Sequence, residues 1–348
     1  MKLSEIVGFK NQLDLLPTVE SIKITTELDL LKIKYLLESK DIVSDEQLQE
    51  LVKNKSNLQQ SFDQIALTIS KIKNYITEII AQKEIEYYED SYQFYKKSVD
   101  VNKGYGYSRE DNDITFFDVF GVLRHVSSNV KNDHKNLINN EILSRNLNIL
   151  DSVKNIIISR ILSYADWHYP AAIIRPSCEN FINHLVASDP LYLIDEHKDL
   201  LLPAMNKFNQ QYQNRLRPYV IDESTDTDIL DQLPNNQFSF FLVYNYFDYK
   251  PLDIIKLYLK EIFEKLRPGG TLGITFNDCD YAGAVSRVEN RAGYYTPGRM
   301  IVEHCAKIGY KEIFKLANNE SSTWVELQKP GILTSTRGGQ TLAKIHHK

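Results

Sequence analysis

Glycine is scarce in this chain, with 14 among 348 residues, roughly 4% where about 7% is usual. None occurs between Gly121 and Gly269. Glycine lets a backbone pass close to a bound ligand, so this stretch has few places for such an approach. The sequence also contains no GxGxxG or GxxxxGK[ST] phosphate loop, no GxSxG elbow and no HExxH helix, which excludes the corresponding enzyme classes as simple assignments.

Cysteine is scarce too, and the three present, Cys178, Cys279 and Cys305, form no CxxC pair. This spacing excludes a disulfide scaffold and a structural zinc site, and it favours a reducing compartment. We expect the three cysteines to be small buried apolar residues, and we expect no metal cofactor.

Long apolar runs and an excess of basic charge are both missing. The 41 Lys and Arg residues against 46 Asp and Glu give a net charge of -5, so the bulk charge does not indicate a nucleic-acid partner. No run approaches the roughly 20 apolar residues that span a bilayer, and Met1–Glu5 is not followed by an apolar signal segment. We therefore expect a soluble, cytoplasmic protein without a membrane partner.

The front half is helical in pattern. After an N-terminal helical segment (1–43), Ser44 and Gln47 form a capping box that begins a long helix (44–103), continuing to about Lys97. Its apolar residues step by three and four: Leu48, Leu51, Leu58, Phe62, Ile65, Ile69, Ile72, Ile76 and Ile79. Such heptads predict a coiled coil or a helical hairpin. The partner is either Leu28–Leu37 or another subunit, and ordinary helix-bundle packing is the alternative.

The next region (104–163) follows a break at Gly104–Asp113, and helices are expected over Ile114–Val126 and Asn136–Tyr164. Before the break, Glu84–Tyr95 mixes aromatic and acidic residues, which favours packing on another surface over nucleic-acid stacking. The C-terminal tail (331–348) is short and mildly basic, and we expect it to be mobile.

The back half (164–330) alternates short strands with helices. Strands are expected at Ala171–Ile174, Leu191–Ile194, Pro218–Ile221, Phe238–Tyr244, Thr271–Phe276, Lys311–Leu316 and Thr323–Gln328. Helices are expected at Glu179–Val186, Lys198–Gln213, Pro251–Leu266 and Pro297–Ile308. This alternation predicts an α/β fold with a doubly wound, mostly parallel sheet, whose ligands bind at the carboxyl ends of the strands.

From Tyr164 to Pro330 the sequence resembles the class I S-adenosylmethionine-dependent methyltransferase family, with a Rossmann-like sheet. Leu266–Leu272 reads as the family's L-x-P-G-G-x-L turn before strand five. The resemblance implies that Asp195, at the end of strand two, holds the cofactor's ribose hydroxyls. It also implies that Asp222 contacts the adenine and that the end of strand four, Phe240–Asn245, borders the substrate.

The cofactor loop departs from the family pattern of an acid followed by three alternate glycines. Ile173 stands at the position of the acid, and Arg175, Ser177 and Glu179 stand at the positions of the glycines. The resemblance then implies that S-adenosylmethionine binding is lost. Two interpretations of the loop stay open: Glu179 pairs with the cofactor's amino or sulfonium group, or the loop is a plain turn with Ser177 as a helix N-cap.

On the substrate side the candidates are Tyr244, Asn245 and Tyr246 after strand four and Asp278 after strand five. Nucleobase methyltransferases carry Asn/Asp-Pro-Pro-Tyr/Phe at the first of these places, and here the prolines are missing. A structural role for Asn245 and Tyr246 and a solvated loop around Asp278 are the expectations.

Two functions follow. The first is a methyltransferase-like pseudoenzyme that forms a homo-oligomer or a larger assembly through its heptad helix. Helical arms joined to such domains resemble proteins of bacteria and their phages, so a virion component is one expected form of this role. The second is an active methyltransferase with an unidentified acceptor. An oxidoreductase is disfavoured because GxGxxG is missing.

Overall fold

The computed structural model describes residues 2–15, 45–104, 108–110, 113–117, 123–127, 151–176, 179–223, 228–318, 322–334 and 343–344. The chain forms two compact units, Met1–Glu86 and Tyr87–Lys348, and each is described by itself. The division falls within a single helix. The five sequence segments expected above, with limits at 43, 103, 163 and 330, stay a prediction.

The first unit contains helix α1 (Leu3–Leu15) and most of helix α3 (Asp45–Gly104). The long predicted helix is thus present, and it runs beyond Lys97 because no glycine or proline interrupts it before Gly104. An ion pair of 2.9 Å joins Asp14 of α1 to Lys73 of α3. Ser44 and Leu28–Leu37 lie outside the described residues, and pairing of the heptad stripe stays a prediction.

The region after α3 contains strands, which corrects one expectation. Strands β1 (Ser108–Glu110), β2 (Asp113–Phe117) and β3 (Leu123–Ser127) form an antiparallel sheet in that order. The helix expected over Ile114–Val126 was wrong. The β-branched and aromatic run in β2 has strand propensity, and Gly121 interrupts a helix. The later expected helix is α5 (Asp151–Tyr164), and residues 136–150 lie outside the described part.

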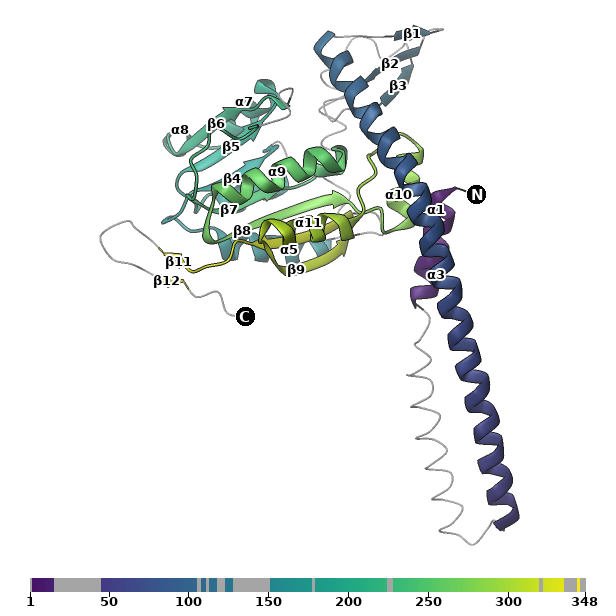
Figure 1. Ribbon diagram of the computed structural model, residues 1–348. Helices are drawn as coiled ribbons and strands as arrows, with labels where there is room; N and C mark the ends of the chain where they lie inside the picture. The colour runs from purple at the N-terminus through teal and green to yellow at the C-terminus, as the bar shows by residue number, and fades with distance from the viewer. Residues whose placement is uncertain are drawn as a thin grey trace. The chain divides into compact units, whose positions relative to one another are not determined.

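The second unit is built on a sheet of seven strands in the order β6-β5-β4-β7-β8-β10-β9 (Figure 1). In chain order the strands are β4 (Ala171–Ile174), β5 (Leu191–Asp195), β6 (Leu216–Val220), β7 (Phe238–Val243), β8 (Leu266–Asn277), β9 (Lys311–Asn318) and β10 (Ser322–Gln328). Strands β4 to β8 pair in parallel, and β10 runs antiparallel to both of its neighbours.

Helices cover both faces of this sheet. Alternate residues of β7 enter two separate apolar clusters, Phe241 in one and Phe240 in the other. The first cluster includes side chains from α9 (Leu252–Lys265) and α11 (Gly298–Ile308), and the second includes side chains from α5, α6 (Glu179–Ile182) and α7 (Lys198–Asn206). The expected α/β fold with a doubly wound, mostly parallel sheet is confirmed.

Several element limits differ from expectation. The helix expected over Lys198–Gln213 is two helices, α7 and α8 (Gln210–Gln213), because the Asn209 side chain caps the second by accepting a bond from the amide of Tyr212. The expected Pro-Gly-Gly turn lies inside β8, where the register with β7 shifts between Phe238 and Phe240. The remaining elements are the helix α10 (Ala282–Glu289), the 3-10 helices Asn183–Leu185 and Phe247–Tyr249, and the strands β11 (Leu333–Thr334) and β12 (Ala343–Lys344).

Candidate functional site

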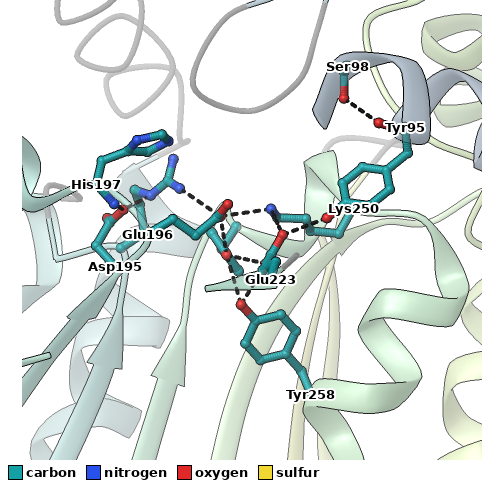
Figure 2. A network of polar contacts seen from close by, with 10 residues as sticks. Tyr95, Ser98, Asp195, Glu196, His197, Glu223, Lys250 and Tyr258 are labelled. Carbon is teal, nitrogen blue, oxygen red and sulfur yellow. Dashed lines mark hydrogen bonds and ion pairs between the residues drawn. The ribbon is translucent and has the colours of Figure 1, made fainter. Parts of the chain in front are cut away.

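The candidate site lies beyond the carboxyl ends of β4, β5, β6 and β7. After β4 the chain adds β5 and β6 on one side, then returns to place β7 on the other side of β4. Ligands of doubly wound sheets bind at such a reversal, because the loops diverge there. Figure 2 shows that charged side chains from these loops converge on one another at this edge.

Arg175 follows β4 and folds back over the end of the sheet. Its backbone is left-handed, with φ of 60°, a conformation that costs a residue other than glycine roughly 1–2 kcal/mol. Its side chain is buried, and its Nε lies 2.8 Å from Oδ2 of Asp195 at the end of β5. Burial raises the pKa of Asp195, and the Arg175 charge opposes that rise. The ion pair therefore holds together two groups that are costly to bury alone.

Glu196, the next residue, connects this pair to a second cation. Its Oε1 lies 2.8 Å from Lys250 Nζ and 3.4 Å from Arg175 Nη2, and it shares the single proton of the Tyr246 hydroxyl with Glu223. Burial acts to raise the pKa of Glu196, but Lys250 and Arg175 outweigh it and lower the pKa to about 2. Glu196 is thus an anion across the neutral range.

Glu223, just after β6, accepts four hydrogen bonds. The donors are the hydroxyls of Tyr95 at 2.7 Å, Tyr258 at 2.6 Å and Tyr246 at 2.5 Å, together with the ammonium of Lys250. Tyr95 comes from α3 and Tyr258 from α9 (Figure 2). One carboxylate at the end of β6 therefore links α3, α9 and the loop after β7.

The network is close to charge balance, and three of its groups, Glu196, Tyr246 and Tyr258, are unsuited to proton transfer at neutral pH. Two cations, Arg175 and Lys250, face three carboxylates, those of Asp195, Glu196 and Glu223. A carboxylate with a pKa near 2 is a weak base at neutral pH. Burial raises the pKa values of Tyr246 and Tyr258 well above the ordinary value, so both phenols stay protonated as donors. The ion pairs and hydrogen bonds of the network hold its charged side chains in fixed positions.

The residues expected in the cofactor loop are only partly brought together. Ile173 is buried inside the sheet, and Asp222 is exposed at the surface. Ser177 lies outside the described residues. Glu179 begins α6, and its side chain lies outside the described part. Arg175 and Asp195 are therefore the two expected residues that meet.

The substrate-side candidates divide in the same way. Tyr244 is buried, with its ring 4.5 Å from that of Phe181 in an edge-on contact. Asn245 has a left-handed backbone with φ of 53°, and its amide donates to Thr275 Oγ1 at 2.7 Å. Tyr246 points into the charged network. Two of the three are thus explained by packing or backbone support.

Asp278 is fully buried, which corrects the expectation of a solvated loop. Its carboxylate accepts bonds from the amide of Gly298 at 2.9 Å, from Thr323 Oγ1 at 2.7 Å and from the amide of Asp280 at 3.1 Å. Gly298 is the first residue of α11, so Asp278 satisfies an amide at the start of a helix. A Cβ at Gly298 would lie 2.6 Å from that carboxylate, which explains the glycine.

Sequence reasoning missed five members of the network: Tyr95, Glu196, Glu223, Lys250 and Tyr258. Glu196 and Glu223 each follow immediately after a residue that was singled out, Asp195 and Asp222. A search of both positions at each strand end would have found them. Tyr95 stands in the stretch expected to pack on another surface, but nothing in the sequence signals its contact with Glu223, 128 residues away in the chain.

Another buried acid, Asp248, lies at the same edge, after β7. Asp248 accepts a hydrogen bond from Ser322 Oγ at 3.5 Å, and burial raises its pKa to about 6, opposed mainly by the charge of Arg287. Arg287 Nη2 donates to the Tyr249 hydroxyl at 3.2 Å. The pKa of Asp248 is thus well above that of an ordinary aspartate.

Within the described ranges, no three His, Cys, Asp or Glu side chains are grouped so that they could hold a metal ion. Among the helices in those ranges, none is both long and apolar enough for a membrane span. Cys279 and Cys305 are buried free thiols, as expected, and Cys178 lies outside the described residues.

No protein-family model matches the chain, and no curated protein matches it in sequence. Solved structures do resemble it. A SAM-dependent methyltransferase from Aquifex aeolicus matches 55% of this chain and 97% of its own, at 12% identity and a TM-score of 0.40. The N-methyltransferase NodS from Bradyrhizobium japonicum WM9, in complex with S-adenosyl-L-homocysteine, matches 51% and 87%, at 14% identity and a TM-score of 0.39.

An O-methyltransferase family 2 protein from Planctomyces limnophilus DSM 3776, in complex with apigenin, matches 58% of this chain and 64% of its own, at 11% identity and a TM-score of 0.43. At such scores the likeness is one of fold and carries no weight for function. The fold assignment rests on this chain's own strand order.

Proposed function

We propose that this chain is a methyltransferase-like protein that does not bind S-adenosylmethionine and serves as a structural or assembly component. The buried ion pair between Arg175 and Asp195 carries the proposal. The methyltransferase resemblance assigns the cofactor's ribose hydroxyls to Asp195 and a glycine to position 175. Arg175 lies against Oδ2 of this buried carboxylate and the amide of His197 donates to its Oδ1 at 2.9 Å, so the ribose hydroxyls would compete with both contacts, and displacement of Arg175 would leave uncompensated charge.

The residues present therefore do not fit the cofactor in this arrangement. Arg175 places a long, charged side chain at the strand end where the resemblance expects none, and its guanidinium lies 4.9 Å from the centre of the Tyr246 ring. Asp195 and Arg175 instead form an ion pair with each other.

The alternative is an active methyltransferase of unknown acceptor. One observation favours it: the backbone at Arg175 keeps the left-handed conformation that glycine adopts readily, so the path of a glycine loop is preserved at that residue. This alternative requires the Arg175 side chain to leave Asp195 when the cofactor binds.

The assembly role is proposed for the heptad helix. Two residues of its stripe on α3, Ile65 and Ile72, are 52% and 39% exposed, and exposed apolar residues at heptad spacing favour pairing with another helix. A homo-oligomer or a larger assembly, in the cytoplasm or in a phage virion, is the form of this proposal.

A thermal shift measurement tests the loss of cofactor binding. With S-adenosylmethionine or S-adenosylhomocysteine at about 1 mM, a ligand with a dissociation constant of about 10 μM adds about 2.7 kcal/mol, which raises Tm by roughly 5–10 °C. We expect Tm to stay unchanged with both compounds. A rise of several degrees with either would overturn the proposal and favour the active methyltransferase.

A further inference from the structure

The carboxyl-terminal turns of α3 contribute to the site described above. Residues 87–98 of α3, the cover segment, belong to the same compact unit as the seven-stranded sheet. Figure 2 shows Tyr95 reaching from this helix toward Glu223 and Lys250 at the sheet edge. The cover segment has two kinds of attachment, which differ in what their loss would leave behind.

The first attachment is to residues 289–296. Asp90 pairs with Arg291 through both guanidinium nitrogens, at 2.5 and 3.1 Å. The amide of Tyr295 donates to Ser91 Oγ at 3.0 Å, and the Tyr87 hydroxyl donates to Glu289 at 2.8 Å. This side of the helix is thus held at three points by polar contacts.

The second attachment is Tyr95 itself. Its side chain is buried, its ring lies edge-on to Tyr294 at 5.9 Å, and its hydroxyl donates to Glu223 at 2.7 Å. The ammonium of Lys250 lies 5.6 Å from the centre of the Tyr95 ring. Tyr95 therefore covers the Glu223–Lys250 pair with an aromatic face and one hydrogen bond.

If Tyr95 moves away, no buried charge is left without a partner. Glu223 would still accept bonds from Tyr246, Tyr258 and Lys250, so its carboxylate stays compensated. Separation of Arg175 from Asp195, in contrast, would leave a buried ion without its partner. Loss of the Tyr95 contact is consequently less costly in buried charge than loss of the Arg175–Asp195 pair.

We propose that the cover segment is a detachable closure: it closes the carboxyl edge of the sheet through Tyr95, and its local detachment exposes the Glu223–Lys250 pair. The proposal rests on the proposed function, because it takes the carboxyl edge of the sheet to be closed in the isolated chain. The proposal concerns only how this closure opens. It can therefore be wrong even if the chain binds no S-adenosylmethionine.

Hydrogen–deuterium exchange of the full chain tests whether the cover segment detaches in this way. The reporter amides are those of His197, Asn245 and Lys250, which donate to Asp195 Oδ1, Thr275 Oγ1 and the Phe247 carbonyl. Tyr95→Phe removes the hydroxyl and keeps the ring. Tyr92→Phe is the matched control, because Tyr92 lies on the same helix with its ring beside Lys96 of that helix.

We expect Tyr95→Phe to speed exchange at the reporter amides by about tenfold, since loss of a hydrogen bond to a charged group shifts an opening equilibrium by at least that factor. Tyr92→Phe should leave those amides unchanged, and the β8 amides should keep wild-type protection in both variants. Unchanged reporters in Tyr95→Phe would overturn the proposal. Faster exchange that extends equally into β8 would also overturn it, because Tyr95 would then support the whole unit.

Discussion

Arg175 and Asp195 end two neighbouring parallel strands and form a buried ion pair, with 2.8 Å between Nε and Oδ2. The pair occupies the strand ends where doubly wound sheets bind ligands. Each charge is buried, and each is compensated mainly by the other. Removal of one should therefore lower the free energy of unfolding strongly.

Arg175→Ala should lower the free energy of unfolding by about 3 kcal/mol at pH 8. The deficit should be smaller at pH 5. Burial raises the pKa of Asp195, and loss of the cation raises it further. A group whose folded pKa is raised adds stability at low pH that is lost as pH rises through that pKa. Urea denaturation at the two pH values measures this.

The control is Arg217→Ala on β6, an exposed arginine that should change stability by less than about 0.5 kcal/mol. If Arg175→Ala lowers the free energy of unfolding equally at both pH values, Asp195 is not the group that loses its partner.

Asp248→Asn should stabilise the protein above pH 6. Burial raises the Asp248 pKa from 3.8 to about 6, so its contribution is present below about pH 4 and lost as pH rises to 6. An amide cannot ionise, and the variant should gain about 1–3 kcal/mol at pH 7.5, with the gain vanishing near pH 4. Chemical denaturation across this range is the measurement.

Asp253→Asn on the exposed face of α9 is the comparison, since its side chain is 68% exposed. A gain at Asp248 that is independent of pH would argue against the raised pKa.

Arg160 of α5 and Glu326 of β10 should be strongly coupled in their effects on the free energy of unfolding. Glu326 is fully buried in β10 and accepts bonds from Arg160, Tyr164 and Trp324 Nε1. Because a third of the Arg160 side chain is exposed, we expect a coupling free energy of about 1–3 kcal/mol between Arg160→Leu and Glu326→Gln. A double-mutant cycle giving less than about 0.5 kcal/mol would show that solvent screens the pair.

The heptad stripe predicts an oligomer. Light scattering of the full chain should give a multiple of 40.3 kDa, and the double variant Ile65→Glu/Ile72→Glu should return it to a monomer. Leu67→Glu is the matched control, because Leu67 is 55% exposed but stands outside the stripe. A monomeric wild-type chain would leave the helical hairpin as the explanation of the stripe.

The strand and helix pattern made most of the α/β sheet predictable. Apolar runs such as Phe238–Val243 are buried on both faces, so they read clearly as strands. Ile114–Val126 was misread because a short run of mixed apolar residues fits both periods. The antiparallel pairing that decides it joins Thr115 to His125 and is not local.

The site was predictable only in part. Arg175 and Asp195 were singled out through the family resemblance, which places both at strand ends. Tyr95 and Lys250 enter through tertiary packing of α3 and of the loop after β7. Asp278 was misplaced because its role as a helix cap depends on Gly298, which lies 20 residues away in the chain.

The central claim is that this edge of the sheet does not hold S-adenosylmethionine. Isothermal titration of the wild-type chain with S-adenosylmethionine and S-adenosylhomocysteine tests it most directly, because both share the ribose that Asp195 would have to bind. With either compound at millimolar concentration, we predict no saturable heat. A saturable isotherm with a micromolar dissociation constant for either would contradict the claim.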